Sequence, residues 1–360
     1  LGIIKKKLED KMVVGIVAEY NPFHNGHKLQ IDYAKTKLGA SQVVVAMSGS
    51  FTQRGEIACF NKYIRAEVAL KCGVDMVFEI PTIFATSSAR EFASAGVELL
   101  AATGVVDTLL FGAECDDKSL FKKSARKLVE LEKTGTLDED IQKQIAEGSS
   151  YAAARANSLK EYIPSEILSS PNNILGLEYC RYIYANNINM DIAIIKRECN
   201  DYNSTKLTGE ISSASAIRAS MDTFGIIPAV PKAAYDVYRI YPAIKSDDVS
   251  QILHYKLLLD QDYLDCTKDL ANRIRDNLDK FVCCSQFCDL LKTKNMAYSR
   301  ISRVICHILL GISDEDFSET KEHGYISYLR MLGFSEYGNQ LLSQIKNNSM
   351  LRLLTSPNED

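Results

Sequence analysis

The chain has 360 residues and a formal net charge of −4, a length that allows two domains with separate hydrophobic cores. With 46% hydrophobic and 24% charged residues it has the composition of an ordinary soluble globular protein. No apolar run approaches the roughly 20 residues of a membrane span, and the first four residues are too short for a signal peptide. Ten cysteines without an export signal indicate a reducing cytoplasm. The slightly negative net charge excludes a surface that binds nucleic acid all over, so any RNA contact requires a local basic patch.

The first predicted strand covers residues 13–17, where β-branched side chains form a short apolar run. Met12 is a candidate natural start, so we expect residues 1–11 to be an N-terminal extension outside the fold. The strand is followed by Asn21-Pro22, which disfavours helix because the residue before a proline is forced out of the helical region. A helix is predicted from the segment 24–27 through Tyr33.

The start of this helix reads His24-Asn25-Gly26-His27. A helix N-terminus offers unpaired amides and the positive end of its dipole to an anion. Gly26 would let the backbone approach a phosphate closely, and two imidazoles can donate hydrogen bonds where negative charge develops. The segment is therefore a candidate phosphate site. The alternative is a turn in which both histidines are solvated or capping side chains.

The next part of the chain alternates between strand-like and helix-like runs. Further strands are predicted at residues 42–47, 75–80, 107–111 and 191–195, and helices at 62–72, 88–102 and 118–133. Strands separated by helices imply right-handed crossovers and a parallel sheet with both faces covered. The fold class expected for residues 12–230 is therefore α/β, with a Rossmann-like parallel sheet.

The pattern changes beyond Pro231, where helices are expected and strands are not. The predicted helices cover residues 251–259, 262–280, 299–310 and 337–345. The break at residues 227–231 is the expected boundary between an α/β domain, 12–230, and a mainly α-helical domain, 231–360. Cys283, Cys284 and Cys288 with His307 leave a zinc site open as an alternative, but buried thiols are favoured and no metal site is predicted.

Ligands of an open parallel sheet bind at the carboxyl ends of its strands. The predicted strands end at residues 20–27, 48–55 and 111–114 and at Lys196-Arg197. Gly112 indicates a place where a nucleoside lies against the backbone, and Arg197 could bind phosphate with two parallel hydrogen bonds. The alternative is that Arg197 is an ordinary surface arginine after a strand.

Residues 210–218 read EISSASAIR and form a second candidate anion site. Ser212, Ser213 and Ser215 offer hydroxyls and a helix cap, and Arg218 follows on the first turns of the helix. A chance serine-rich cap is the alternative.

Both segments resemble signatures of the adenylyl-transferring nucleotidyltransferases and class I aminoacyl-tRNA synthetases, whose second signature is I-S-S-T-x-I-R. Ala214 departs from that signature. The chain is similar to the bacterial tRNA(Met) cytidine acetate ligase family. Five further segments carry this resemblance: SGSFTQRGE, LLFGAE, SPNNILGLEY, IIKRE and GYISYLRMLGF. The resemblance extends from about Met12 to near Leu354, so the chain ends a little earlier than we expect of that family.

The resemblance implies that residues 12–230 form a nucleotidyltransferase-like, ATP-binding catalytic domain and that residues 231–360 bind tRNA. It also implies an ATP-dependent ligase in which acetate attacks the α-phosphate of ATP, giving acetyl-adenylate and pyrophosphate. The acetyl group then passes to the exocyclic amine of the wobble cytidine of elongator tRNA(Met), giving N4-acetylcytidine. Charge stabilisation is expected from His24, His27, Arg197 and Arg218, with Mg²⁺ on the triphosphate. Expected ATP contacts are Val17, Ala18, Glu19, Tyr20, Asn21, Pro22, Phe23, His24, Asn25, Gly26, His27, Lys28, Leu29, Gln30, Gly112, Asn173 of the pair Asn172-Asn173, Arg197, Ser213 and Ser215.

The sequence is also compatible with two other functions. One is a cofactor-pathway adenylyltransferase acting on a phosphorylated small molecule, and the other is an RNA-binding protein that keeps a nucleotide as a structural ligand. For tRNA we expect the helical domain to dock the tRNA body while the α/β domain receives the anticodon base. The candidate basic patches are Lys62, Arg65 and Lys71, and Lys292, Lys294, Arg300, Arg303 and Arg330.

Overall fold

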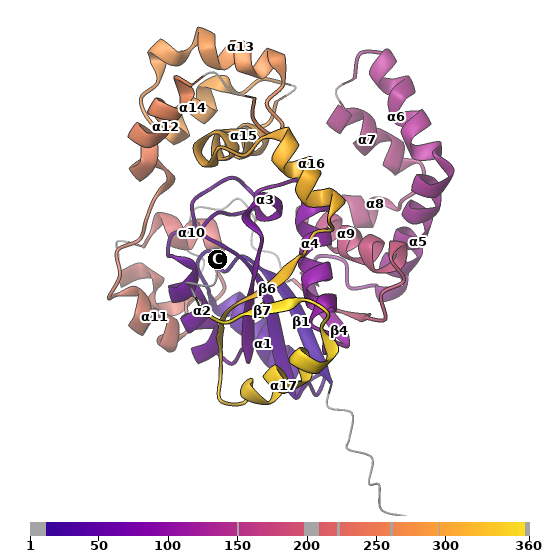
Figure 1. The fold of residues 1–360 in the computed structure, drawn as a ribbon, viewed down its shortest axis with the longest axis vertical. Coiled ribbons are helices and arrows are strands. Elements are labelled where there is room, and N and C mark those ends of the chain that lie inside the picture. The colour runs from indigo at the N-terminus through magenta and orange to yellow at the C-terminus, as the bar shows by residue number, and fades with distance from the viewer. Residues whose placement is uncertain are drawn as a thin grey trace, which may run out of the picture.

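A computed structural model describes residues 12–149, 151–197, 209–221, 224–259, 262–294 and 296–356. The extension predicted for residues 1–11 lies outside these ranges. Seven strands form one sheet at the centre of the molecule (Figure 1). They are β1 (Val13–Ala18), β2 (Gln42–Ser48), β3 (Met76–Ile80), β4 (Thr108–Ala113), β5 (Asp191–Lys196), β6 (Tyr328–Phe334) and β7 (Arg352–Leu354).

The strand order is β5-β4-β1-β2-β3-β6-β7, and β1 to β5 are parallel. The chain runs outward from β1 to β3 and then starts again on the other side of β1 with β4. The topological switch point therefore lies between β1 and β4, where such sheets bind their ligands. The predicted Rossmann-like α/β fold and its first five strands are confirmed.

Helices cover both faces of the sheet and form the two outer lobes seen in Figure 1. They are α1 (Asn25–Thr36), α2 (Lys62–Lys71), α3 (Thr82–Ala85), α4 (Ala89–Ala102), α5 (Lys118–Thr134), α6 (Thr136–Ala146), α7 (Tyr151–Lys160), α8 (Ser165–Leu168), α9 (Pro171–Ala185), α10 (Ala214–Ala219), α11 (Lys232–Tyr238), α12 (Ser250–Leu257), α13 (Lys268–Asp276), α14 (Cys284–Leu291), α15 (Tyr298–Leu310), α16 (Asp314–Glu322) and α17 (Asn339–Asn348), with 3₁₀ turns at Phe224–Ala229, Ser246–Val249 and Leu278–Lys280. None of the described helices combines the length and the apolar sequence needed to cross a bilayer.

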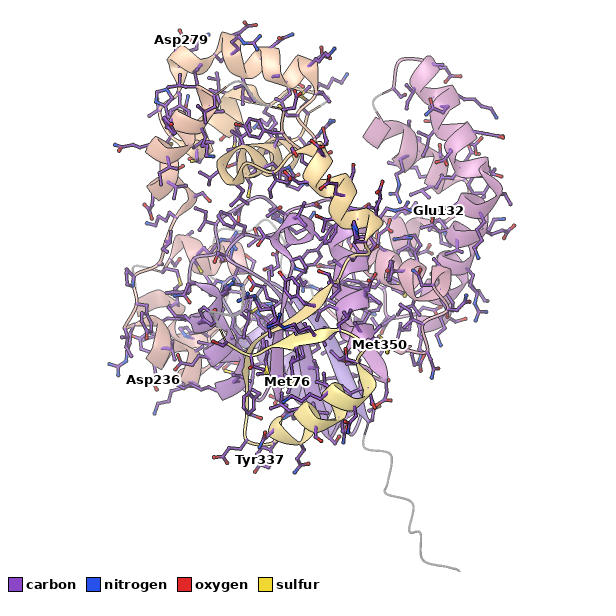
Figure 2. All side chains as sticks on the ribbon, viewed as in Figure 1. Met76, Glu132, Asp236, Asp279, Tyr337 and Met350 are labelled. Carbon is purple, nitrogen blue, oxygen red and sulfur yellow. The ribbon has the colours of Figure 1, made fainter. Side chains whose placement is uncertain are left out.

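Two hydrophobic cores lie on opposite faces of the sheet because successive strand residues point in opposite directions. In β2, Val44 and Ala46 pack toward the core that contains α4, α5 and α9, whereas Val43 and Val45 pack toward α1, α2 and α11. Figure 2 shows the resulting distribution, with Met76 inside the molecule and Tyr337 and Met350 at its surface. A sheet buried on both faces explains why its strands read as continuous apolar runs.

The expectation that no strands follow Pro231 is wrong. Strand β6 pairs antiparallel with β3, placing Phe334 opposite Met76, and β7 extends the sheet beyond β6. This pairing joins segments about 250 residues apart, so local periodicity contains no signal for it. Strands from the last part of the chain therefore complete the sheet that the first part begins. The domain boundary between residues 230 and 231 stays a prediction.

A third hydrophobic core belongs to α12, α13, α14 and α15. Cys284 and Cys288 are buried in it, as the interpretation of buried thiols predicts. The ring nitrogens of His307 lie 3.0 Å from the Leu264 carbonyl oxygen and 3.1 Å from that of Thr86. The predicted helix at 262–280 begins only at Lys268.

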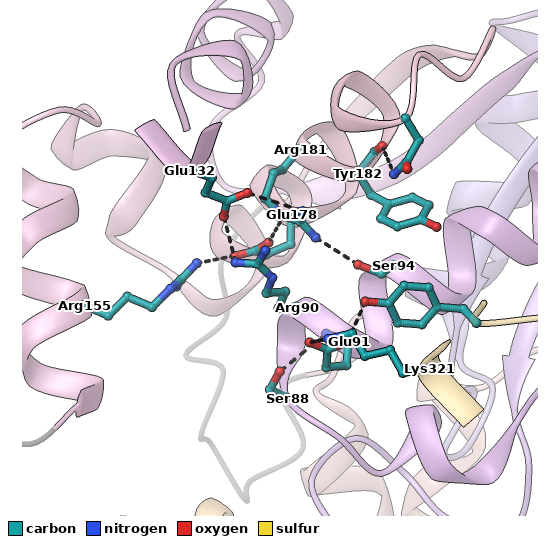
Figure 3. A network of polar contacts seen from close by, with 12 residues as sticks. Ser88, Arg90, Glu91, Ser94, Glu132, Arg155, Glu178, Arg181, Tyr182 and Lys321 are labelled. Carbon is teal, nitrogen blue, oxygen red and sulfur yellow. Dashed lines mark hydrogen bonds and ion pairs between the residues drawn. The ribbon is translucent and has the colours of Figure 1, made fainter. Parts of the chain in front are cut away.

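A buried polar network ties the helices of one face together (Figure 3). Glu178 on α9 accepts hydrogen bonds from Arg155 on α7 at 2.8 Å and from Arg181 at 2.6 Å. Arg181 also donates to Ser94 on α4 at 2.9 Å, so three helices meet at this carboxylate.

Candidate active site

A cavity of about 580 Å³ lies at the carboxyl ends of the strands around the switch point. Its walls come from the turn between β1 and α1, the loop after β2, the ends of β4 and β5, the start of α9 and helix α10. These are the strand ends and the serine-rich segment that the sequence places together. The structure therefore unites the two predicted anion sites in one chamber.

The two histidines of the β1–α1 turn form a stacked pair, with ring centroids 3.8 Å apart. His24 caps α1, because its Nδ1 accepts a hydrogen bond from the Gly26 amide at 3.1 Å. The His24 amide donates to Nδ1 of His27 at 3.2 Å. Since both Nδ1 atoms accept, the hydrogen-bond network assigns the neutral tautomer with its proton on Nε2 to each ring.

Both imidazoles are held in the neutral state. Burial, with a smaller contribution from the positive charge of Arg197, lowers the pKa of His24 to about 3. Burial, His24 and Arg197 together place the pKa of His27 well below its usual range. His24 is only 8% exposed and caps α1, so for this residue the alternative of a solvated side chain is wrong and the capping role is confirmed. Each ring can donate a hydrogen bond without carrying a charge.

The turn leaves no room for a side chain at Gly26, because a Cβ there would lie 2.9 Å from the His24 ring. Tyr20 adopts a φ of 49°, a left-handed conformation that is rare for a residue with a bulky side chain. Its ring packs edge-on against His27 at 4.9 Å. Strained backbone of this kind persists where the surrounding structure fixes a functional geometry.

Most of the predicted stretch 17–30 lines the cavity, but Pro22, Phe23, Asn25 and Lys28 do not. Phe23 is fully buried, and its backbone amide and carbonyl both bond to the Tyr238 hydroxyl. Asn25 donates to two backbone carbonyls at 2.8 Å, and Lys28 pairs with Asp32. These side chains hold the turn in place rather than forming the cavity wall.

The two predicted arginines both reach the cavity but differ in how they are held. Arg218 donates to the Asn21 carbonyl at 2.8 Å, to Glu56 at 3.1 Å and to Ser215 at 3.3 Å, which fixes it against the histidine turn. Arg197 has a 45% exposed side chain and lies 3.8 Å from the Glu114 carboxylate. Three partners thus fix Arg218 in position, while the side chain of Arg197 is the more exposed of the two.

The other predicted contacts also lie around this chamber. Gly112, Ser213 and Ser215 line it, and Ser213 caps α10 by accepting from the Ala216 amide at 3.1 Å. The two adjacent asparagines differ in their surroundings. Asn173 is 1% exposed and binds the Glu114 and Cys115 amides and the Glu166 carbonyl, whereas Asn172 lines the cavity.

The polar side chains of the loop after β2 are not among the predicted site residues, although residues 48–55 are predicted to reach this edge. Gln53, Arg54 and Glu56 line the cavity. Burial raises the pKa of Glu19 despite a hydrogen bond from the Gln53 amide. The sequence signal was available in SGSFTQRGE, which holds Gln53, Arg54 and Glu56 just after a predicted strand.

The first predicted basic patch is wrong. Arg65 is 0% exposed, and its guanidinium donates to backbone carbonyls of Phe60, Ser48, Glu19 and Gly49. It is a structural residue beneath the loop after β2.

The remaining patch residues are also dispersed or paired. Lys62 pairs with Glu79 and Lys71 with Glu67. Arg330 is buried on β6, with its Nε 3.9 Å from Glu79, so it does not join Lys292, Lys294 and Arg300 on the helical lobe. The second predicted patch is therefore wrong as a single surface.

The family model of the HIGH nucleotidyl transferases matches residues 11–360. The chain is 33% identical over 361 residues to the tRNA(Met) cytidine acetate ligase of Clostridium perfringens, covering 95% of this chain and 89% of the relative. It is 35% identical over 366 residues to the protein of that name from Clostridium kluyveri, with the same coverage.

Two solved structures of Thermotoga maritima TmcAL are also similar, each at 29% sequence identity. The apo structure has a TM-score of 0.90 and covers 96% of this chain and 86% of that one. The structure bound with alpha-thio ATP has a TM-score of 0.87 and covers 96% and 85%. The chain belongs to the HIGH nucleotidyl transferase family and, within it, to the tRNA(Met) cytidine acetate ligases.

Proposed function

We propose that this protein is an ATP-dependent ligase that acetylates the wobble cytidine of elongator tRNA(Met) through an acetyl-adenylate. The observation that carries the proposal is the neutral histidine pair facing Arg197 and Arg218 in one cavity at the switch point. The similar Thermotoga maritima TmcAL structure is bound with alpha-thio ATP, which supports a nucleotide in this cavity. Since tRNA is the acceptor, we place the protein in the cytoplasm.

In this proposal the triphosphate lies between the histidine turn and the two arginines, and the nucleoside lies along Gly112. Attack on an α-phosphate requires positioning and neutralisation of charge more than covalent catalysis. The Nε2–H groups of His24 and His27 donate to phosphate oxygens, and the arginines supply positive charge. Acetate attacks, pyrophosphate leaves, and the acyl-adenylate stays in the cavity.

The expected Mg²⁺ would arrive with the triphosphate. Within the part of the chain that the structure describes, no group of three His, Cys, Asp or Glu side chains is arranged to hold a metal ion. Phosphate oxygens and water would then supply most ligands, as is common for Mg²⁺. The ion would neutralise charge on the phosphates.

The helical lobe built on α12 to α15 is proposed to dock the tRNA body. It contacts the loop after β2 directly, because Ser302 on α15 donates to the Gly55 carbonyl at 3.3 Å. A Cβ at Gly55 would lie 2.4 Å from the Ser302 carbonyl oxygen, so this contact is close. An RNA held on the lobe would lie beside the loop that carries Glu56, a cavity residue.

The proposal predicts acetate-dependent exchange of labelled pyrophosphate into ATP without RNA, and acetyl transfer when bulk tRNA is added. Nucleoside analysis of the product tRNA should give N4-acetylcytidine. Exchange that depends on a phosphorylated small molecule instead of acetate would indicate a cofactor-pathway adenylyltransferase. ATP binding with no exchange under any condition would indicate a nucleotide kept only as a structural ligand.

Lysine at either arginine position should weaken ATP binding, because lysine keeps the charge but not the forked geometry. We expect Arg218→Lys to raise the Kd for ATP by roughly tenfold or more, since Arg218 also holds the Asn21 carbonyl, Glu56 and Ser215. Arg197→Lys should have a smaller effect. Titration calorimetry measures both, with the exposed Arg239→Lys as control. Unchanged Kd values in both variants would remove these arginines from the nucleotide site.

A further inference from the structure

A second cavity, of about 350 Å³, lies between the loop after β2 and helices α14 and α15. The rings of Phe51 and Tyr298 contribute to its mostly apolar lining. Glu56 and Arg218 line both this cavity and the nucleotide cavity. Its volume is within the range of small-molecule pockets, so it is large enough to hold a ligand.

The shared wall lies at the phosphate side of the nucleotide cavity. Arg218 is bonded to the carbonyl of Asn21 in the histidine turn, while Gly112, the proposed nucleoside contact, does not line the second cavity. A group entering from the second cavity would therefore approach the acyl carbon of an adenylate rather than its nucleoside. That is the position an acceptor requires.

The chemistry of the second cavity favours binding over covalent catalysis. Burial raises the pKa of Cys288 and of Cys306, each to about 12, so these lining thiols stay neutral and are weak nucleophiles. In the same lining, Asp247 accepts two hydrogen bonds of 2.7 Å from Ser285. An apolar chamber with a few placed polar groups resembles the pockets in which enzymes hold an unstacked base.

We propose that the second cavity receives the acceptor cytosine base of the RNA and that Glu56 takes the proton from its exocyclic amine. This inference rests on the proposed function. The amine nitrogen forms a bond to the acyl carbon, the bond from that carbon to the phosphate oxygen breaks, and AMP leaves. The proton of the amine moves to the Glu56 carboxylate and from there to water.

A cytosine fits these walls better than acetate does. Acetate is small and charged, whereas this chamber is mostly apolar. Carboxylates are common acceptors of hydrogen bonds from the cytosine amine. The chamber is also enclosed jointly by the α/β part and the helical lobe, so an RNA docked on the lobe could insert one base there.

Filling the cavity should separate the two half-reactions. Ala243 lines it, and Ala243→Phe should lower acetyl transfer to tRNA at least about tenfold while acetate-dependent pyrophosphate exchange stays within about twofold. The control is Ala271→Phe, because Ala271 lies on α13 of the helical lobe and does not line the cavity. A parallel loss of exchange and transfer in Ala243→Phe would overturn the assignment, as would unchanged transfer.

The role of Glu56 is tested by Glu56→Gln, which keeps a hydrogen-bond acceptor for Arg218 but cannot take the proton. The kcat of transfer should fall roughly a hundredfold with little change in the KM for tRNA, as for loss of a general base. Glu56→Asp should restore part of the rate. A rise in KM alone, or an equal loss of pyrophosphate exchange, would contradict the assigned proton transfer.

If the wild-type protein transfers no acetyl group, the proposed function is refuted. A binding measurement still tests the cavity assignment in that case. The probe is an RNA hairpin whose loop carries one unpaired cytidine, measured by fluorescence anisotropy. Ala243→Phe should bind it at least about tenfold more weakly than Ala271→Phe does. Equal binding of the hairpin by both variants would overturn the assignment.

Discussion

Replacing His27 with alanine should lower acetate-dependent pyrophosphate exchange by roughly a hundredfold while the protein stays folded, because removal of one preorganised donor typically has that effect. The ring of His27 lines the nucleotide cavity, and its Nδ1 is occupied by the His24 amide. Its Nε2–H is therefore the group left for a phosphate oxygen. His27→Gln should recover part of the rate, because the glutamine amide can donate from a similar position.

His24 has two roles that different substitutions can separate. His24→Asn can still accept the Gly26 amide as a helix cap, so stability should change little while exchange falls at least about tenfold. His24→Ala should lose both the cap and the donor. The control is His323→Ala, which replaces an exposed histidine at the end of α16. Near wild-type exchange in both His24→Asn and His27→Ala would remove the histidines from the mechanism.

The lowered pKa values also predict the pH response of the free protein. The folded state disfavours protonation of His24, so its contribution to stability is present above the unfolded value of about 6.5 and is lost as pH falls toward about 3. His27 acts in the same direction. NMR of selectively labelled histidine should show both rings neutral from pH 8 to about 5, assigned through the two variants.

The part of this site that sequence reasoning predicts is the part encoded by local segments. The histidine turn and the serine-capped helix combine a strand end with residues whose chemistry is plain, and the switch-point rule then brings them together. Asn173 is buried whereas Asn172 lines the cavity, because two adjacent asparagines on a helix point in different directions, which their sequence order does not reveal. Arg65 was wrongly assigned to a basic patch, because its guanidinium is buried and hydrogen bonds to four backbone carbonyls offset the cost of that burial. A local sequence pattern does not reveal this set of partners.

The same distinction explains the strand β6 and the second cavity. Strand β6 becomes a strand through its pairing with β3, and the cavity exists where the loop after β2 meets α15. A consequence is that a chain ending at Val230 is a poor test of tRNA docking. It would remove Tyr238, whose hydroxyl holds the backbone of Phe23, and would expose the edge of β3. Point substitutions on the helical lobe test docking without that damage.

Glu178→Gln should destabilise the fold by about 3 kcal/mol, because it leaves two arginines without their shared countercharge in a buried place. Burial alone raises the pKa of Glu178, but Arg155 and Arg181 outweigh it and hold that pKa below its usual range. The carboxylate is therefore charged in the folded protein and joins α7, α9 and, through Arg181, Ser94 on α4 (Figure 3). Urea unfolding at pH 7 should show a clearly lower midpoint for the variant.

The direction of the pKa shift predicts how this difference depends on pH. A carboxyl group with a lowered folded pKa contributes stability that is fully present above its unfolded value, about 4.3, and is lost as pH falls through the folded value. The gap between wild type and Glu178→Gln should therefore shrink as pH is lowered below that range. The control is Glu130→Gln, which breaks an exposed pair with Lys127 and should change stability by less than about 1 kcal/mol. Equal urea midpoints for Glu178→Gln and Glu130→Gln would show that the network of Figure 3 contributes no more than a surface pair.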